Sequence, residues 1–409
     1  MPTNKLEAFL TGELEQLARD GTKKGAESVI VEVLAATDTK GPRYRLRGEG
    51  ERAFLRMNAN GYLGLSQRAE TVQAEEVAVR RYGTGPQAVR FISGTFAPHV
   101  ALEERLAAFH GRDGCMIFSS AYAAVMGILP SLIGEQTVVV SDELNHNCII
   151  NAMRLSRPAE RVIVPHLDVA AVERALDEAA GRCRRAIVVS DGVFSMRGDS
   201  APLSDLAGVV RERDRGFAEG CLLVVDDSHG VGVLGETGRG TEEYEGVQAD
   251  LLVATLGKAF GVNGGYVAGS AAVIEYLREK SPFYVYSNPI TPGEAAAAKA
   301  AIDLLDGPVG RALLERVRAL TARFEAGLSA LGFETIAGPH PVVPLMVRDT
   351  GRTRALVQHL RDHDVLATGL TDPVVPRGDE EIRFQISAEH TEADIDQALA
   401  ALQTFGAGR

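Results

Sequence analysis

The sequence predicts an α/β protein with a mostly parallel central sheet and a smaller α+β region at its C-terminal end. Six short apolar runs rich in β-branched residues lie between residues 115 and 268, separated by helix-length segments. Polar residues follow these runs, a pattern typical of parallel strands covered by helices on both faces. Because ligands bind where the strands of such a sheet end, the residues after each run are the first candidates for a site.

Composition and charge limit the class of protein. With 409 residues, 45% of them hydrophobic and 24% charged, the chain is long enough for one large domain and a smaller one. The net charge of -12 argues against nucleic acid as a partner, because such an interface needs a basic face. The N-terminus shows no secretory signal and the four cysteines are widely spaced, so we expect reduced thiols in the cytoplasm and no metal site.

The N-terminal segment predicts an amphipathic helix followed by an arm. Apolar residues recur there at helical spacing, namely Leu6, Phe9, Leu10, Leu14 and Leu17. Such a helix packs either on its own subunit or on a partner. A turn-rich stretch at residues 58–65 and a glycine-rich loop at residues 82–86 come next, and both have the backbone freedom to approach a ligand closely.

The central region predicts the parallel sheet. Its strand-like runs are residues 115–118, 137–140, 186–190, 221–225, 251–255 and 265–268. Residues 115–134 carry no charge, but Ser119, Gly127 and Pro130 interrupt them. A strand, a turn and a buried helix fit this stretch better than a membrane span.

The C-terminal region predicts a linking helix and a small α+β domain. Helical patterns cover residues 293–305 and 309–331, and strand candidates lie near residues 342–347 and 382–386. A last helix is expected at residues 391–404, where Thr391 and Asp394 have the spacing of a weak capping box. We therefore expect three parts, an N-terminal helix and arm (1–57), a large domain (58–292), and a linking helix with a small domain (293–409).

Three residues just after two of the apolar runs carry side chains that are typical of a catalytic site. Lys258 follows the run 251–255, and Asp226 and His229 follow the run 221–225. At the ends of two buried strands, an amine, a carboxylate and an imidazole would come together. Pyridoxal phosphate (PLP) enzymes need this set, since a lysine holds the cofactor aldehyde and an anion keeps the pyridine nitrogen protonated. The sequence therefore predicts a PLP enzyme.

Each of these residues also has an ordinary structural interpretation. A lysine after a strand is commonly a solvated charge, Asp226 could cap the next turn, and His229 could be a loop histidine. The prediction depends on the combination of the three. A buried carboxylate at Asp226 would be costly without a cationic partner, and a protonated pyridine would be such a partner.

Further candidates lie after other runs. The imidazole of His146 could stack on the pyridine ring, and free backbone N–H groups at the strand-to-helix junction 119–122 could hold a phosphate. Hydroxyl groups of Thr255 and Ser287 could add donors, although serines at helix starts are mostly caps. Arg383, a lone charge inside a strand-like run, could bind a substrate carboxylate through two hydrogen bonds or lie on a sheet edge.

Several motifs in the same order resemble the α-oxoamine synthase family of fold-type I PLP enzymes, and within it most of all the glycine C-acetyltransferases (2-amino-3-ketobutyrate CoA ligases). The resemblance covers nearly the whole chain. It is carried by residues 60–65, 89–95, 141–146, 191–196, 225–229, 255–258, 286–288 and 373–376, followed by Arg383. It implies an aspartate aminotransferase-like fold in which residues 58–292 form the PLP-binding domain.

The resemblance implies a role for each candidate. Lys258 would hold the cofactor and transfer protons, Asp226 would pair with the pyridine nitrogen, His229 would bond to the phenolic oxygen, and His146 would stack on the ring. The other contacts would be Ser120, Ala121, Tyr122, Ser195, Thr255 and a second subunit's Ser287 for the cofactor, with Asn60 and Arg383 for the carboxylate of an amino acid. The family is typically homodimeric with shared active sites.

The implied reaction joins glycine to a short acyl-CoA, above all acetyl-CoA, and gives a 2-amino-3-oxoacid and CoA. An alternative within the family is a specialised synthase that uses another amino acid or a carrier-protein thioester, with or without loss of carbon dioxide. The chain departs from the acetyltransferase pattern at Gly61, residues 121–124 and Phe260, close to where the cofactor or acyl chain would lie. A PLP aldolase or lyase acting on threonine-like substrates and a non-catalytic scaffold are the alternatives outside the family.

Overall fold

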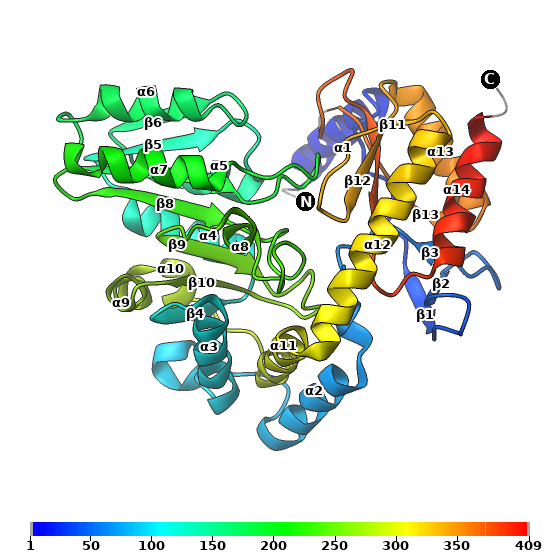
Figure 1. Ribbon diagram of the computed structural model, residues 1–409, viewed down its shortest axis with the longest axis horizontal. Coiled ribbons are helices and arrows are strands. Elements are labelled where there is room, and N and C mark those ends of the chain that lie inside the picture. Colours follow the sequence, from blue (N-terminus) through cyan, green and yellow to red (C-terminus); the bar gives the residue numbers. More distant parts are fainter. Residues whose placement is uncertain (1–2, 373, 407–409) are drawn as a thin grey trace.

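The computed structural model describes residues 3–372 and 374–406. Its centre is a seven-stranded sheet with the order β4-β10-β9-β8-β7-β5-β6 (Figure 1). The strands are β4 (Gly114–Phe118), β5 (Thr137–Asp142), β6 (Glu160–Val164), β7 (Arg185–Asp191), β8 (Cys221–Asp226), β9 (Leu251–Thr255) and β10 (Gly265–Gly269). Each apolar run identified in the sequence forms a strand, so the predicted fold class is confirmed.

Within the central sheet, the strand that the sequence pattern did not predict is β6, which lies at one side of the sheet. It pairs in parallel with β5, and most of its side chains are only partly covered. Glu160 and Arg161 begin it, which leaves only three apolar residues in the run. An edge strand has solvent on one side, so its sequence does not need the continuous apolar pattern of a central strand.

The strand directions bring the loops of the candidate site together. The strands β5 to β9 run parallel, while β10 lies antiparallel between β9 and β4. Consequently β4 points the same way as β9, and Gly265 at the start of β10 pairs with both Phe118 and Thr255. The carboxyl ends of β4 to β9 therefore lie along the same border of the sheet, the one that crosses the strand ends.

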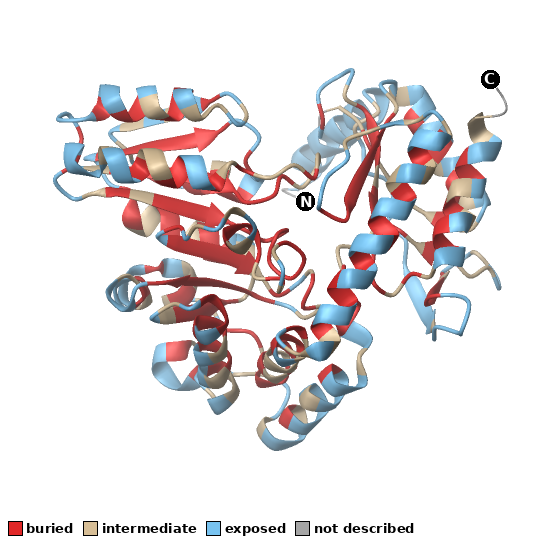
Figure 2. Ribbon diagram, in the orientation of Figure 1, coloured by how far each residue is buried: buried red, intermediate tan, exposed pale blue. Residues whose placement is uncertain are grey.

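Helices cover both faces of the sheet (Figure 1). One face packs on α4 (Ala121–Leu132), α5 (Asn147–Leu155) and α9 (Ala271–Lys280), and the other on α6 (Val169–Ala179), α7 (Leu203–Arg213) and α3 (Ala97–His110). The other helical segments of this region are η1 (Leu65–Gln67), α2 (Ala69–Tyr82), η2 (Arg90–Gly94), η3 (Asp214–Gly216), α8 (Thr241–Glu245) and α10 (Pro282–Val285). The central strands between the two layers are buried (Figure 2), as their valine and isoleucine content requires.

The C-terminal region contains a second sheet, with the order β11-β12-β15-β14. The helices and strands of this region are α11 (Pro292–Leu305), α12 (Pro308–Ala330), β11 (Glu334–Thr335), β12 (Val342–Met346), α13 (Thr350–Asp362), β14 (Thr368–Leu370), β15 (Glu381–Gln385) and α14 (Glu392–Gly406).

The last helix, α14, starts with the expected capping box. The Asp394 N–H donates to Thr391 Oγ1 at 3.2 Å, and the Thr391 N–H donates to the Asp394 carboxylate at 2.8 Å.

The N-terminal arm is attached to the C-terminal region. β1 (Ile30–Leu34) and β2 (Arg43–Leu46) pair with each other, and β3 (Leu55–Arg56) pairs in parallel with β13 (Val365–Leu366). A buried ion pair between Arg43 on β2 and Asp394 on α14 is a second contact between the arm and the C-terminal region. The domain limits at 57/58 and 292/293 stay predictions. Pro373, which begins one of the family motifs, lies outside the described residues.

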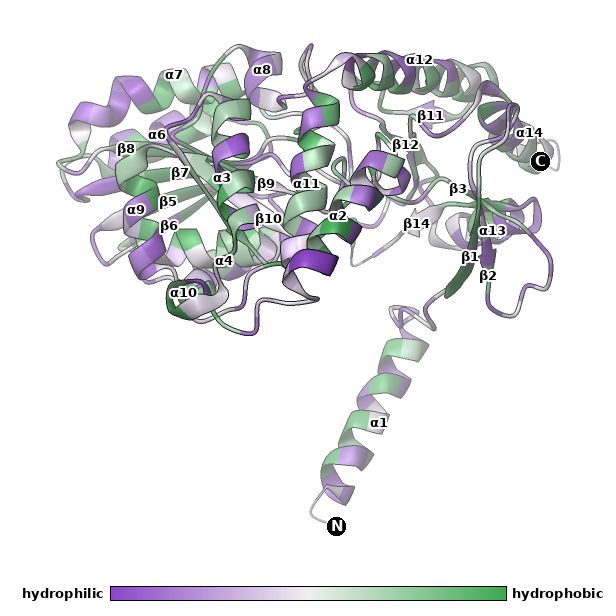
Figure 3. Cartoon of the chain, turned by 90° about the horizontal axis from the view of Figure 1, so that it is seen from below, coloured by the Kyte–Doolittle hydropathy of each residue, from purple (hydrophilic) through white to green (hydrophobic). Residues whose placement is uncertain are grey.

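The first helix, α1 (Asn4–Arg19), extends away from the rest of the chain (Figure 3). None of its residues is buried, and Phe9 on its apolar face is 62% exposed. Of the two packing modes expected for α1, the structure shows none on its own chain within the described residues, and packing on a partner stays a prediction. In the part of the chain that the structure describes, none of the helices combines the length and apolarity that a membrane span requires.

Candidate active site

A cavity of about 220 Å³ lies where several strands of the central sheet end. Of the residues expected to hold the cofactor, all but Ser120 and Ser287 line it. The complete lining is Ala121, Tyr122, His146, Cys148, Asp191, Val193, Ser195, Asp226, Ser228, His229, Thr255 and Lys258. The strand order explains this gathering, because these side chains follow β4, β5, β7, β8 and β9 at the same edge.

Two carboxyl groups lie side by side in the wall of the cavity. Asp191 at the end of β7 is the register partner of Asp226 at the end of β8, and both are buried. Asp226 accepts hydrogen bonds from the Ser228 N–H at 3.1 Å and from the Cys148 thiol at 3.6 Å. Burial, and then the charge of Asp226, raise the pKa of Asp191 well above its ordinary value. Asp191 is thus more easily kept neutral than an ordinary exposed carboxyl group.

Lys258 lies in the turn after β9, where the chain leaves the sheet. Its side chain is half-buried at the cavity. Burial lowers the pKa of the Lys258 amine, and the nearby carboxylates of Asp226 and Asp191 only partly oppose this. A lysine with a lowered pKa is more often uncharged near neutral pH, which is the form that can act as a nucleophile or a base.

His229 is held from two sides. Its Nδ1 lies 2.8 Å from the hydroxyl oxygen of Tyr62, and its backbone carbonyl accepts a hydrogen bond from His340 Nε2 at 2.8 Å. Since His340 Nδ1 accepts from the Val342 N–H, the proton of that neutral ring is on Nε2. Burial, followed by the charge of Lys258, lowers the pKa of His229 well below its ordinary value, so the ring is neutral.

His146 sits at the N-terminus of α5 with its ring against the cavity. Its Nδ1 accepts from the Cys148 N–H at 3.3 Å, and its own backbone N–H donates to the Asp191 carboxyl group at 3.0 Å. Burial lowers the pKa of His146, although the charge of Asp226 acts in the opposite direction. The neutral ring lies edge-on to Tyr122, with 6.4 Å between the ring centres.

The start of α4 supplies backbone donors on another wall. Ala121 and Tyr122 are its first residues and line the cavity. The Ser120 hydroxyl instead caps the helix by accepting from the Ala123 N–H at 3.0 Å. Thr255 Oγ1 also has backbone partners, donating to the Gly264 carbonyl at 3.2 Å and accepting from the Gly257 N–H at 3.0 Å.

Besides Ser120, three expected residues do not line the cavity. Ser287 lies in the segment after α10, where its hydroxyl donates to the Asn288 carbonyl at 3.4 Å. Asn60 and Arg383 do not line the cavity themselves, but each contacts another residue of the site. The Tyr62 hydroxyl lies 3.3 Å from Asn60 Oδ1, and Arg383 on β15 donates to the carbonyl of Ser195, a lining residue, at 2.9 Å.

Four of the residues that build this site have no role predicted from the sequence. Asp191 and Tyr62 lie inside motifs that were recognised, so their position within those motifs was the available signal. Cys148 follows His146 by two residues, and its spacing in the sequence predicts only a reduced thiol. His340 lies in a loop before β12 and has no sequence pattern that marks it.

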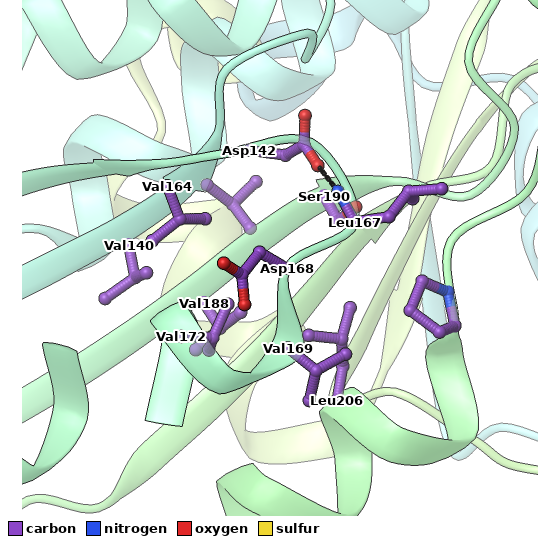
Figure 4. Close-up of a pocket in the computed structure, with 12 residues that line it drawn as sticks. Val140, Asp142, Val164, Leu167, Asp168, Val169, Val172, Val188, Ser190 and Leu206 are labelled. Atoms are coloured by element: carbon purple, nitrogen blue, oxygen red, sulfur yellow. Dashed lines mark hydrogen bonds between the residues drawn. The ribbon is translucent and has the colours of Figure 1, made fainter. Parts of the chain in front are cut away.

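A second, much smaller cavity lies between the sheet and α6 (Figure 4). Its volume is about 20 Å³, and valine and leucine side chains form most of its wall. Of its two acids, Asp142 accepts from the Leu167 N–H at 2.8 Å, and Asp168 caps α6 by accepting from the Ala171 N–H. A space of this size holds about one water molecule. It is therefore a packing void and not a substrate site.

The residues around the larger cavity fit PLP. Two buried polar atoms of its lining residues, Asp191 Oδ1 and Ser228 Oγ, have no hydrogen-bond partner within the described residues. Buried polar atoms are normally paired, so a bound polar molecule would complete the site. A lysine, a carboxylate, neutral imidazoles and a helix N-terminus are the groups that an aldehyde, a pyridine nitrogen, a phenolic oxygen and a phosphate require.

Comparisons with known proteins agree with this chemistry. The family profile described as aminotransferase class I and II matches residues 52–402. The 8-amino-7-oxononanoate synthase of Geobacter metallireducens is 44% identical over 364 residues, which are 88% of this chain and 90% of that protein. The mitochondrial 2-amino-3-ketobutyrate coenzyme A ligase of Homo sapiens is 37% identical over 405 residues, covering 98% of this chain and 92% of that protein.

Solved structures share the fold over the whole chain. The serine palmitoyltransferase of Sphingomonas wittichii superimposes with a TM-score of 0.88 at 25% identity, covering 99% of this chain and 98% of that one. A serine palmitoyltransferase structure that contains PLP gives a TM-score of 0.88 at 26% identity, again with 99% and 98% coverage.

Proposed function

The chain belongs to the aminotransferase class I and II family and to its PLP-dependent α-oxoamine synthases, and on that premise we propose that it joins an amino acid to an acyl thioester. The observation that carries the proposal is the single cavity that gathers Lys258, Asp226 and His229 at the ends of β8 and β9. Bound PLP supplies an electron sink for the charge left when a bond at the amino acid Cα breaks.

The residues of the cavity divide this work. The Lys258 amine would hold the cofactor aldehyde and would take the Cα proton, a task that its lowered pKa favours. The Asp226 carboxylate would hold the proton of the pyridine nitrogen, and the Cys148 thiol and Ser228 N–H keep its two oxygens in place. His229 would donate to the phenolic oxygen, and His146 would pack against the ring face.

The phosphate and the amino acid would be bound at the margins of the cavity. Backbone N–H groups of Ala121 and Tyr122 point to a phosphate site at the start of α4, with the Thr255 hydroxyl nearby. Because Ser287 does not line the cavity of its own chain, we propose that the partner's Ser287 completes the phosphate site in a cytoplasmic homodimer. Asn60 and Arg383 would orient the substrate carboxylate.

The first candidate for the substrates is glycine with a short acyl-CoA, acetyl-CoA above all. The motifs of the chain favour it, and so does the ligase of Homo sapiens, whose name contains 2-amino-3-ketobutyrate and coenzyme A and whose similarity extends over 98% of this chain. The product would keep the amino acid carboxylate.

The second candidate is a specialised synthase with a longer acyl chain. The higher identity to the 8-amino-7-oxononanoate synthase of Geobacter metallireducens favours it, since that name describes a nine-carbon acid with an amine beside a ketone. For this chain, the second candidate predicts another amino acid, a longer acyl thioester and a product that has lost carbon dioxide.

One screen tests the proposal and separates the two candidates. The PLP-loaded protein is mixed with a panel of amino acids and acyl thioesters, and free thiol and product mass are measured. We expect thiol release only when an amino acid is present, with the mass showing whether the carboxylate is kept. Lys258→Ala should abolish this release. Acetaldehyde from threonine without thiol release would instead identify an aldolase, and inactivity with every pair would contradict the proposal.

A further inference from the structure

We propose that Tyr62 is a positioning residue that fixes which ring nitrogen of His229 carries the proton. The inference rests on the role proposed above for His229, that it donates a hydrogen bond to the phenolic oxygen of the cofactor. A neutral imidazole has one N–H, so only one of its two tautomers can donate in a given direction. The neighbour of the other nitrogen therefore decides whether His229 can perform its role.

Tyr62 is placed to make this choice. It lies between β3 and η1, its side chain is fully buried, and its hydroxyl oxygen is 2.8 Å from His229 Nδ1. The second polar neighbour of this hydroxyl, Asn60 Oδ1, is farther away at 3.3 Å. A buried hydroxyl must donate to some acceptor, and the shorter contact is the one to His229.

The ionisation of both groups is consistent with donation from Tyr62. Burial raises the pKa of Tyr62 well above its ordinary value, and the nearby Arg383 opposes this only weakly, so the phenol keeps its proton. Burial lowers the pKa of His229, so the ring has a free lone pair to accept that proton. With Nδ1 used as the acceptor, the remaining proton of His229 is on Nε2, the nitrogen on the opposite side of the ring from Tyr62.

The backbone around His229 leaves the ring little freedom to escape this contact. His340 donates to the His229 carbonyl at 2.8 Å, and the Tyr62 ring packs against His340 at a centre distance of 5.2 Å and an angle of 81°. The alternative tautomer would require His229 to donate to Tyr62 and Tyr62 to depend on the longer contact to Asn60. The geometry disfavours that arrangement.

The chain provides a matched control in a second buried tyrosine–histidine pair. The hydroxyl oxygen of Tyr266 lies 2.8 Å from His110 Nε2, and both residues are buried. Neither residue lines the candidate active site. Tyr266→Phe therefore removes a hydrogen bond of the same type and length from the same molecule without touching His229.

The test compares Tyr62→Phe, Tyr266→Phe and the wild type as PLP-loaded proteins. Nitrogen-15 chemical shifts of labelled histidine identify the protonated nitrogen of His229, whose signals are assigned from their absence in His229→Gln. We expect the proton on Nε2 in the wild type and in Tyr266→Phe. In Tyr62→Phe the tautomer ratio should shift toward Nδ1–H by about tenfold, the effect of one hydrogen bond of ordinary strength. The absorbance bands of the bound cofactor should change in Tyr62→Phe alone.

The outcomes separate this inference from the proposed function. A wild-type proton on Nδ1 would overturn the inference even if Tyr62→Phe does not fold, and so would an unchanged tautomer ratio in Tyr62→Phe. If His229→Gln leaves the cofactor absorbance unchanged, the proposed role of His229 fails, whatever its tautomer. Substrate identity does not enter either measurement, so a negative thioester screen leaves the tautomer result valid.

Discussion

The charge state of each titratable residue at the strand ends of the central sheet depends on its burial and on the charges of its neighbours. His229 is buried beside the Lys258 amine and His146 lines the same cavity, and the pKa of each ring is lowered. Asp191 is buried beside another carboxyl group, and its pKa is raised. The loss of water around these groups thus favours neutral imidazoles and a neutral Asp191 beside Asp226, the proposed partner of the pyridine nitrogen.

This asymmetry predicts different effects for the two carboxyl groups. Asp226→Asn should weaken PLP binding by about tenfold to a hundredfold, because it leaves a buried cationic ring without its anion. Asp191→Asn should change binding by less than about threefold, because it replaces a neutral acid by a neutral amide of the same shape. Titration of the cofactor-free variants with PLP, followed by absorbance, measures both. Equal losses in the two variants would contradict the assignment of the charge to Asp226.

Outside the cavity, His166 differs from the two histidines of the site, because its pKa is raised and not lowered. It bridges Asp142 at 3.0 Å and Asp199 at 3.2 Å, and its ring packs edge-on against Phe194. Burial acts to lower the pKa of His166, but the two carboxylates outweigh it and raise the pKa to about 9. Because the pKa is higher in the folded chain, this stabilisation is complete below the unfolded value and is lost as the pH rises through about 9.

His166→Gln should therefore destabilise the protein in a pH-dependent way. At pH 7 we expect a loss of about 2 kcal/mol in the free energy of unfolding, the usual value of a partly buried charged hydrogen bond. The difference from the wild type should shrink toward zero near pH 10, where the wild-type ring is also neutral. Chemical unfolding at a series of pH values measures this, and a difference that stays constant with pH would refute it.

The candidate site could be predicted where residue type and position carry the chemistry. Lys258, Asp226 and His229 directly follow apolar runs, and the parallel sheet brings them together. Tyr62 and His340 could not be predicted in the same way, because they reach His229 from distant loops. Their roles depend on hydrogen-bond geometry that only the packed fold defines.

At the level of elements, the sequence predicts structure best where a pattern has one physical interpretation. The buried strands β5, β7, β8 and β9 have continuous apolar runs, and the Thr391 cap marks the start of α14. The edge strand β6 was missed because its charged residues hide it. The placement of α1 could not be predicted, because an apolar helix face shows that a partner exists but not which one.

The exposed apolar face of α1 predicts a role for this helix in the proposed homodimer. Leu10 is 47% exposed and belongs to an apolar stripe on α1 that residues 3–372 and 374–406 leave uncovered. We expect the stripe to pack on a second copy, so Leu10→Asp should raise the dimer dissociation constant by about tenfold or more. Glu13→Ser, on the same helix, is the control and should have no effect. Analytical ultracentrifugation measures both, and a Leu10→Asp protein that sediments like the wild type would exclude this role.

At the level of the whole molecule, the cofactor should couple to global stability. The cavity walls come from loops after five strands of the central sheet, so PLP binds the folded chain and not the unfolded one. At a hundredfold excess over its dissociation constant, such a ligand stabilises by about 2.7 kcal/mol. Removing PLP should lower the thermal midpoint by a few degrees, and calorimetry of the two forms measures it. Identical midpoints would show that the cofactor does not contact the folded core.

The order of strands has a consequence for how the polypeptide emerges from the ribosome. β4 has no neighbour until β10 at residues 265–269 has been translated, and β3 at residues 55–56 waits for β13 at residues 365–366. Both early segments therefore leave the exit tunnel with open edges, the state in which nascent chains associate wrongly. The native strand pairing is completed only near the end of translation. We therefore expect a chain that stops before residue 365 to be degraded by proteases instead of folding into a smaller enzyme.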